Sequence, residues 1–511
     1  MSTDVFDRGH GRDESPGAQA AEVPVRRNRI RWGGVVAGVA LALLVYAVLP
    51  GDLAVAARIT AATATLMAAW WMTEAIPIPA TALLPLLIFP VLVDDVTVDD
   101  VGASYGNNII FLFMGGFMLA LAMQRWNLHR RIALLTVRAM GTNPPMVVAG
   151  FMVATGFISM WVSNTATAVM MLPIGVSVLV LVTDIGAEDD GEVKEAVIRS
   201  NFGTALMLGI AYAASVGSLA TIIGTPPNTL LVGYMDSEYD VEIGFGQWML
   251  VGLPLAVVFL VICWWMLVKV LFKPEIDDIP GGREMLGAEL DKLGPTSQGE
   301  WRVLAVFVLA AASWVTLPLV FDEPPISDAG IAVGIAVLLF LLPAGAARGV
   351  RLLDWDAAVK LPWGVLLLFG GGLALSAQFT SSGLTEWIGE QAGGLDGVPV
   401  VLLVVIVAAG VLLLTELTSN TATAATFLPV AGGVALGLDL DPLLLAIPVA
   451  LAATCAFMLP VATPPNAIAF GSGYVTISQM IRGGIWLNLI GVVLITTVTM
   501  TLAVWVFGIA Y

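Results

Sequence analysis

The sequence has little of the chemistry on which enzymes and metal centres usually depend. It contains only two cysteines and two histidines in 511 residues. Cys263 and Cys455 both lie in apolar runs, which excludes a disulfide framework and a thiolate metal cluster. His10 and His129 lie in a tail and in a basic stretch, and neither has a second ligand at metal-binding spacing. We therefore expect both histidines to be structural or solvated.

Charged residues are also scarce, at 12% of the chain, whereas hydrophobic residues make up 58% and the mean hydropathy is +0.91. A soluble chain of this length needs more polar surface. Apolar stretches close to the roughly 20 residues that span a bilayer recur, for example at 33–48, 252–268, 303–320 and 485–507. The sequence therefore predicts an all-α polytopic membrane protein with about 11 transmembrane helices and two re-entrant hairpins.

The charges that are present indicate the orientation in the membrane. Basic residues fall almost wholly on one side of the predicted spans, which predicts a cytoplasmic N-terminus and an extracellular C-terminus in the plasma membrane. Residues 1–31 form a polar tail ending in RRNRIR, so we expect a disordered cytoplasmic segment and no cleavable signal peptide. The net charge of −17 fits either a surface adapted to high salt or ordinary solvated loops. Neither alternative favours nucleic acid as a partner.

The chain contains an internal duplication. LALAMQ at 119–124 matches LALSAQ at 373–378, SNTATA occurs twice, and GTPPN at 224–228 matches ATPPN at 462–466. Three matches in the same order predict two homologous halves. We place the first repeat at 32–271, a cytoplasmic linker at 272–300 and the second repeat at 301–511. An odd number of spans in each half gives opposite orientations, an inverted repeat whose substrate site lies near the bilayer midplane.

The GTPPN motif predicts a helix that breaks and restarts inside the membrane. Gly224 can end a helix in the left-handed conformation, Thr225 can cap the next helix, and Pro226 suits its first turn. The second copy differs by an alanine in place of the glycine. A break at this depth exposes carbonyl groups that suit a sodium ion and N–H groups that suit an anion.

The two SNT motifs predict the tips of re-entrant hairpins. Stretches 146–162 and 166–182, each short for a bilayer, flank the first motif, and 400–414 and 422–436 flank the second. Basic segments precede the first hairpin and acidic ones flank the second, so we expect the tips to meet from opposite faces. A lone SNT in a membrane helix more often bonds a neighbouring helix. Its duplication beside paired helix breaks favours a ligand site.

From about Trp32 onward, the chain resembles the divalent anion/sodium symporter family. The resemblance rests on WWMTEAIPIPATALLP at 70–85, the two SNT motifs, GTPPN and VATPPN. It implies a transporter of dicarboxylates, tricarboxylates or sulfate with an elevator mechanism. It further implies a scaffold that forms a homodimer in membrane lipid, and two or more coupling sodium ions.

The resemblance also implies ligands, which share hydroxyl, amide or backbone carbonyl oxygens. The first sodium site corresponds to Ser159, Ser163 and Asn164 with the backbone at Gly224. The second corresponds to Thr415, Thr418 and Asn420 with the backbone at Ala462. Substrate contacts correspond to Asn164, Thr165, Thr225, Ser419, Asn420, Thr421 and Thr463. The repeat supports the pairing of Ser159 with Thr415, since each lies four residues before its SNT serine.

No lysine or arginine lies in any of these motifs. Sodium would therefore supply the positive charge that a dianion needs, which makes the two affinities coupled and predicts sodium symport of C4-dicarboxylates such as succinate, malate or fumarate. A sulfate or citrate transporter and a sodium-independent exchanger remain alternatives. A membrane enzyme is least favoured, because the membrane core offers no catalytic constellation, and a receptor is disfavoured because no signalling domain is recognisable.

Two acidic residues lie within apolar segments. For Glu74 we favour a structural role such as helix capping. For Glu416 three alternatives stay open: it tunes the second sodium site, it accepts a proton, or it holds the second hairpin by hydrogen bonds.

Overall fold

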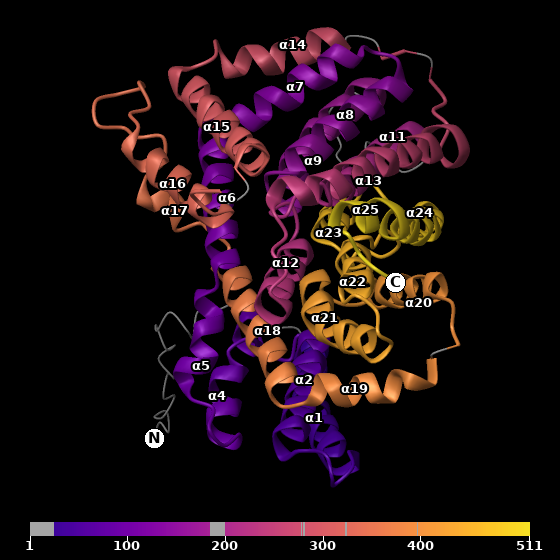
Figure 1. The fold of residues 1–511 in the computed structure, drawn as a ribbon. Helices are drawn as coiled ribbons and strands as arrows, with labels where there is room; N and C mark the ends of the chain where they lie inside the picture. The colour runs from indigo at the N-terminus through magenta and orange to yellow at the C-terminus, as the bar shows by residue number, and fades with distance from the viewer. Residues whose placement is uncertain (1–24, 184–199, 277, 280–281, 322–323, 396) are drawn as a thin grey trace, which may run out of the picture.

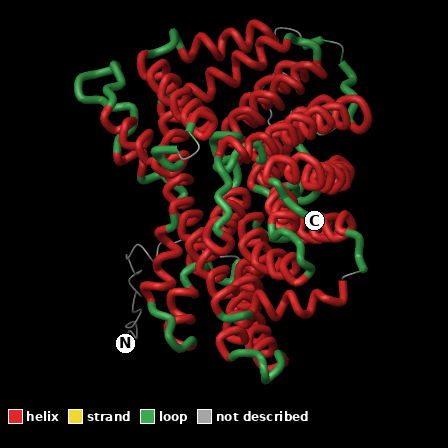
Figure 2. The backbone as a smooth tube through the Cα atoms, viewed as in Figure 1, coloured by secondary structure: helices red, strands yellow, loops and turns green. Residues whose placement is uncertain are grey.

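The computed structural model describes residues 25–183, 200–276, 278–279, 282–321, 324–395 and 397–511 (Figure 1). Within these ranges the regular structure is helical, and Figure 2 shows helices joined by loops. A single isolated bridge pairs Pro343 with Arg351. The prediction of an all-α fold is thus confirmed. Of the predicted tail, residues 1–24 lie outside the described part, and residues 25–31 form the first turns of α1 (Val25–Val48).

Six helical stretches in the described part are long and apolar enough to cross a membrane, or up to seven if a pair bent by 119° counts as one. Five further apolar helices in the described part are shorter, and three of them, Pro144–Ser159, Asn164–Val180 and Leu443–Thr454, adjoin breaks at the SNT motifs or at the GTPPN and ATPPN motifs. The number of about 11 spans therefore stays a prediction. The six stretches are Asn28–Val48, Val98–Arg125, Phe245–Leu271, Gln298–Val320, Trp363–Ser381 and Ile477–Phe507.

The first half opens with a helical hairpin and ends with a long apolar helix. Its elements are α1, α2 (Val55–Thr73), α3 (Ile78–Thr81), α4 (Leu84–Leu92), α5 (Val98–Ala103), α6 (Asn108–Arg125), α7 (Leu128–Met140), α8 (Pro144–Ser159), α9 (Asn164–Thr183), α11 (Asn201–Ser218), α12 (Pro226–Tyr239) and α13 (Phe245–Trp265), which continues as a π-helix to Leu271. The predicted linker contains α14 (Gly282–Leu293).

The second half is helical as well. Its elements are α15 (Gln298–Val320), α16 (Asp328–Leu341), α17 (Trp355–Ala358), α18 (Trp363–Ser381), α19 (Leu384–Ala392), α20 (Val400–Thr415), α21 (Asn420–Gly437), α22 (Leu443–Thr454), α23 (Pro464–Gly471), α24 (Ile477–Val498) and α25 (Val504–Phe507). The pairs α8/α9 and α20/α21 are the predicted hairpins. The pairs α11/α12 and α22/α23 are the predicted broken helices. In Figure 1, α9 and α21 lie on either side of α12, α22 and α23.

Two helices, α11 and α22, are enclosed by other elements and are here called the central helices. All residues of α11 from Phe202 to Ser218 are buried, and so are all residues of α22. A helix that is apolar all round is expected to be enclosed by other elements. Small residues allow this close packing: a Cβ at Gly217 of α11 would collide with the backbone of Gly156 in α8. The two central helices therefore hold the breaks that follow them in fixed positions.

The break after α11 corrects one prediction. Gly224 is not among the residues with a left-handed backbone, and α11 ends earlier, at Ser218. The glycine is required for space instead, because a Cβ there would collide with the carbonyl oxygen of Ser218. The segment between the two half-helices folds tightly back on itself, so steric contact, not helix termination, selects glycine at this position.

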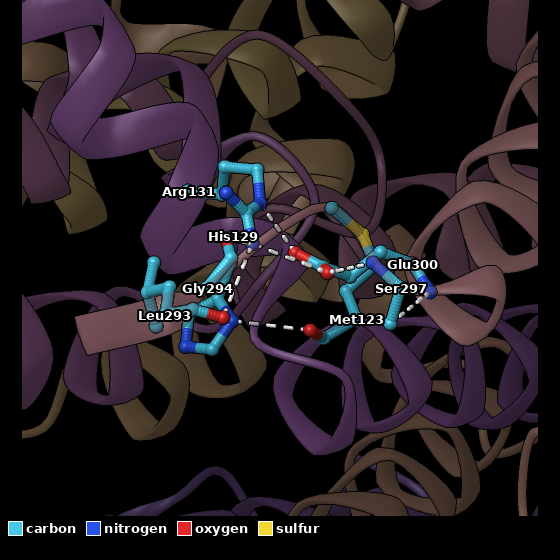
Figure 3. A network of polar contacts seen from close by, with 7 residues as sticks. All are labelled: Met123, His129, Arg131, Leu293, Gly294, Ser297 and Glu300. Atoms are coloured by element: carbon cyan, nitrogen blue, oxygen red, sulfur yellow. Dashed lines mark hydrogen bonds and ion pairs between the residues drawn. The ribbon is translucent and has the colours of Figure 1, made fainter. Parts of the chain in front are cut away.

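A polar network joins α7 to the start of α15, away from the helix breaks (Figure 3). The Arg131 guanidinium donates to both carboxylate oxygens of Glu300, at 2.6 and 3.3 Å, and to the carbonyl oxygen of Gly294 at 3.0 Å. Glu300 also accepts the backbone N–H of Ser297 at 2.7 Å, which forms a capping box at the start of α15. This ion pair ties the first half to the linker and the second half.

Candidate functional site

A cavity of about 930 Å³ lies where the two hairpins and the two broken helices meet. Its wall includes both SNT tips and both PPN turns, so it draws on both halves of the chain. All of the predicted substrate contacts line it: Asn164, Thr165, Thr225, Ser419, Asn420, Thr421 and Thr463. The structure thus brings together residues that are widely separated in the sequence.

The predicted cation ligands divide into two groups. Ser163, Gly224, Thr418 and Ala462 also line the cavity. Ser159 and Thr415 do not; both are fully buried behind the wall. The Ser159 hydroxyl donates to the carbonyl oxygen of Ala214 at 2.6 Å, and the Thr415 hydroxyl donates to the carbonyl oxygen of Ala453 at 2.8 Å. In both halves, the residue four before the SNT serine therefore joins its hairpin to the end of a central helix.

The two PPN turns start their helices as predicted, with one difference. Thr225 and Thr463 are the N-cap residues of α12 and α23, each followed by proline. The Thr463 hydroxyl accepts the backbone N–H of Asn466 at 3.3 Å. The Thr225 hydroxyl makes no such capping bond and instead lies 3.2 Å from the hydroxyl of Thr454. Both helix starts offer fewer backbone donors than predicted, because the first two residues of each helix are prolines, which have no N–H, and the N–H groups of Asn228 and Asn466 already donate to Thr225 and Thr463.

The asparagine that ends each PPN motif was not among the predicted site residues. The Asn228 amide donates to the carbonyl oxygens of Leu219 and Thr221, at 3.2 and 2.9 Å. Asn466 donates in the same way to Ala456 and Leu459, at 3.2 Å each. Both asparagines are fully buried and hold the chain between the two half-helices. The repetition of this residue in both motifs was the signal in the sequence that could have revealed the role.

Four polar groups gather at the second hairpin. One terminal atom of the Asn420 amide lies 2.9 Å from Thr415 Oγ1, 3.0 Å from the Ala462 carbonyl oxygen and 3.1 Å from the Ala453 carbonyl oxygen. The hydrogen-bond network assigns this atom as nitrogen, since it then donates to all three oxygens. If the amide turned, its own oxygen would face the same three oxygens, an arrangement that a cation would stabilise.

The first hairpin lacks this arrangement. The Asn164 side-chain oxygen accepts the adjacent backbone N–H of Thr165 at 2.8 Å, and Ser163 Oγ accepts the N–H of Ala166 at 3.3 Å. In the described part of the chain, no hydrogen bond joins Asn164 to Ser159. The first tip is also more open: Thr165 is exposed, whereas Thr421 is 9% exposed. The two halves are therefore alike in sequence order and unlike in local contacts.

The contacts of Glu416 support one of its three alternatives, the structural role. Its carboxylate accepts the backbone N–H groups of Phe457, Met458 and Leu459, at 2.8 to 3.0 Å, and the Asn488 amide at 2.7 Å. The side chain is 2% exposed, and its two oxygens accept from four donors. Glu416 thus holds the second hairpin against the break between α22 and α23, the third of the alternatives. Tuning of a sodium site or proton uptake is not tested by these contacts.

Two charged side chains line the cavity from outside the SNT motifs and the GTPPN and ATPPN motifs. Arg31 of α1 and Glu74 at the end of α2 both contribute to its wall. Glu74 ends α2 in the left-handed conformation, with φ of 46°, which agrees with the predicted capping position. Arg31 was not predicted as a site residue, because the sequence placed it in the N-terminal tail. Among the described residues, no group of three or more His, Cys, Asp or Glu could hold a metal ion.

Comparison with known proteins gives consistent results. Residues 30–509 match the family described as "Sodium:sulfate symporter transmembrane region". The chain is 44% identical over 448 residues to the "Sodium-dependent dicarboxylate transporter SdcS" of Staphylococcus saprophyticus, covering 87% of this chain and 85% of that protein. The fold is similar to two solved transporter structures. One is YdaH of Alcanivorax borkumensis, with a TM-score of 0.51 and 12% sequence identity, where the match covers 93% of this chain and 98% of that chain. The other is MtrF of Neisseria gonorrhoeae, with a TM-score of 0.51 and 14% sequence identity, where the match covers 96% of this chain and 97% of that chain.

Proposed function

The chain belongs to the sodium:sulfate symporter family, and we propose that it is a sodium-coupled symporter for C4-dicarboxylates such as succinate, malate and fumarate. It is a multi-pass protein of the plasma membrane and, as a member of this family, a transporter and not an enzyme. The dicarboxylate is favoured over sulfate or citrate because the similar staphylococcal protein bears the name of a sodium-dependent dicarboxylate transporter.

The observation that carries this proposal is the shared cavity. Hydroxyl and amide groups from both SNT tips meet the starts of α12 and α23 in one space. These neutral donors suit the carboxylates of a dianion. They lack the positive charge to hold it tightly, and the cluster at Asn420, with its amide turned, would offer oxygens suited to a sodium ion. Binding of the cation and of the anion should therefore reinforce each other.

The roles of individual residues follow from position. We assign the second sodium ion to Thr415, Thr418, Asn420 and the backbone at Ala462, and the first to Ser159, Ser163, Asn164 and the backbone at Gly224. The substrate carboxylates would contact Asn164, Thr165, Thr225, Ser419, Asn420, Thr421 and Thr463. The two asparagines belong to both sets. They are the groups through which sodium and substrate would be coupled.

The transport mechanism we propose is alternating access by an elevator movement. Repeats at 32–271 and 301–511 would lie inverted in the bilayer, with the N-terminus in the cytoplasm and the C-terminus outside, and the scaffold would form a homodimer surrounded by lipid. With this orientation, the start of α1 and the end of α2 are cytoplasmic. Because Arg31 and Glu74 belong to the cavity wall, the cavity would be open to the cytoplasm, an inward-facing state.

Uptake into proteoliposomes tests the proposal. Purified protein is reconstituted, and labelled succinate, citrate and sulfate are each supplied with an inward gradient of sodium or of potassium. We expect accumulation of succinate with sodium only. Equal uptake in potassium would overturn symport. Preferential uptake of sulfate or citrate would reassign the anion, and uptake that requires dicarboxylate inside the vesicles would identify an exchanger.

A further inference from the structure

Arg31 is the cationic side chain in the described part of the cavity wall. It lies in the first turns of α1, far along the sequence from the SNT, GTPPN and ATPPN motifs that form the site. Its Nε is shielded from solvent and has no hydrogen-bond partner. Arg31 also makes no hydrogen bond or ion pair with any other residue that the structure describes. Glu74, the acidic residue of the same wall, has interactions of its own.

An arginine in this situation is unusual because the guanidinium stays charged at all physiological pH values and carries five donors. A shielded donor without an acceptor costs free energy, so proteins normally pair it. Apolar side chains also line the cavity, among them Trp71, Phe113 and Val365. An anion that enters the cavity from solution can supply the acceptor that the described residues do not.

A carboxylate is the acceptor that fits best. The guanidinium fork binds the two oxygens of a carboxylate in parallel, which combines charge with geometry. The polar groups at the SNT tips and helix starts are neutral and attract an anion only at short range. A fixed positive charge on the wall of a cavity with apolar sides also raises the local concentration of anions.

We propose that Arg31 binds one carboxylate of the dicarboxylate within the cavity and thereby favours dianions over monoanions. This inference rests on the proposed function. The other carboxylate is bound, then or in a following step, by the neutral donors of the tips. Arg31 is thus a specificity-determining residue that lies outside both repeats as they were defined by sequence. Its contribution is to affinity and selectivity, and not to sodium coupling.

The test compares Arg31→Gln with Arg29→Gln. Arg29 lies on the same helix, is exposed, and does not line the cavity, so its substitution removes the same charge without the contact. The half-saturating concentrations of succinate and of monomethyl succinate, a monoanion, are measured at saturating sodium in proteoliposomes. For Arg31→Gln we expect the value for succinate to rise about tenfold, the loss of roughly one charge-assisted contact. The value for the monoanion should change far less.

Arg29→Gln should match the wild type, and Arg31→Lys, which keeps the charge but not the fork, should lie between wild type and Arg31→Gln. If Arg31→Gln equals the wild type, or if both ligands weaken equally, Arg31 does not recognise the second carboxylate and the inference is overturned. If Arg31→Gln does not fold, a wild-type affinity in Arg31→Lys with unchanged selectivity overturns it as well. Absence of sodium-driven uptake by the wild type is a different result, which overturns the proposed function and this inference with it.

Discussion

The hydroxyl oxygens of Thr225 and Thr454 lie 3.2 Å apart, so the start of α12 in the first half contacts the end of α22 in the second. Both side chains are buried, at 1% and 0% exposure. Thr225 also lines the cavity, whereas Thr454 lies behind it. The two broken helices therefore meet directly at the wall of the candidate site.

Replacing Thr454 by valine should destabilise the protein by about 1 to 3 kcal/mol, because the buried Thr225 hydroxyl loses its partner. Thr225→Val should cost a similar amount and, in addition, weaken succinate binding. The double variant should cost less than the sum of the two, because the residues are in contact. Thermal unfolding and succinate uptake measure the two effects. Strict additivity would show that the hydroxyls are not coupled.

Asn164→Ala and Asn420→Ala should each weaken both sodium and succinate binding, by about 1 to 3 kcal/mol, if each amide contacts both ligands. The measurement is the dependence of uptake on the concentration of each ligand. Asn201→Ala is a suitable control, because that exposed asparagine begins α11 and does not line the cavity. A variant that loses affinity for sodium alone, or for succinate alone, would contradict a shared site.

Glu416→Gln should lower the unfolding temperature and weaken the second sodium site together. The amide that replaces the carboxylate brings its own N–H groups toward backbone donors, so at least one donor loses its partner, at about 1 to 3 kcal/mol. The turn that carries Ala462 would then be less well fixed. Asn488→Ala removes only one of the four donors and should have a smaller effect. An unchanged unfolding temperature in Glu416→Gln would argue against the structural role.

Arg131→Met should destabilise the protein by about 3 to 5 kcal/mol, because it leaves the buried Glu300 carboxylate without its cation. Arg130→Met provides the matched comparison: its partner is Glu289, and the Arg130 side chain is 36% exposed against 13% for Arg131. That substitution should cost about 0 to 1 kcal/mol. Thermal unfolding of the two purified variants ranks them, and equal costs would refute the argument from burial.

The stability of the protein should fall as the pH drops below about 6.5, the ordinary pKa of histidine. Burial lowers the pKa of His129 in α7. The hydrogen bond from the His129 ring to the Met123 carbonyl oxygen, at 3.1 Å, raises this pKa by less, and the charge of Arg130 lowers it further. The unfolded chain then binds more protons than the folded one, so acidification favours unfolding. Unfolding temperatures measured from pH 7.5 to 5.5 should decline less in His129→Gln than in the wild type. Identical slopes would exclude this histidine.

Sequence reasoning located the breaks of the structure well because breaks depend on local chemistry. The predicted hairpin arms at 146–162 and 400–414 correspond to α8 and α20, and the half-helices restart at Pro226 and Pro464 as the motifs indicated. The prediction of a left-handed Gly224 was wrong. Glycine is needed there because a Cβ would collide with the carbonyl oxygen of Ser218, a contact that no local sequence pattern reveals.

Composition and motif order by themselves determined that this chain is an all-α membrane protein, that its helices break twice in each half, and which polar residues stand at the breaks. Those features follow from short-range rules of helix capping and from the solvation of apolar segments. Only the tertiary structure decided that both tips and both turns face one cavity, that Ser159 and Thr415 lie behind its wall, and that Arg31 joins it. These relationships arise from packing between residues distant in the chain, where shape and burial select the contacts and local propensity does not.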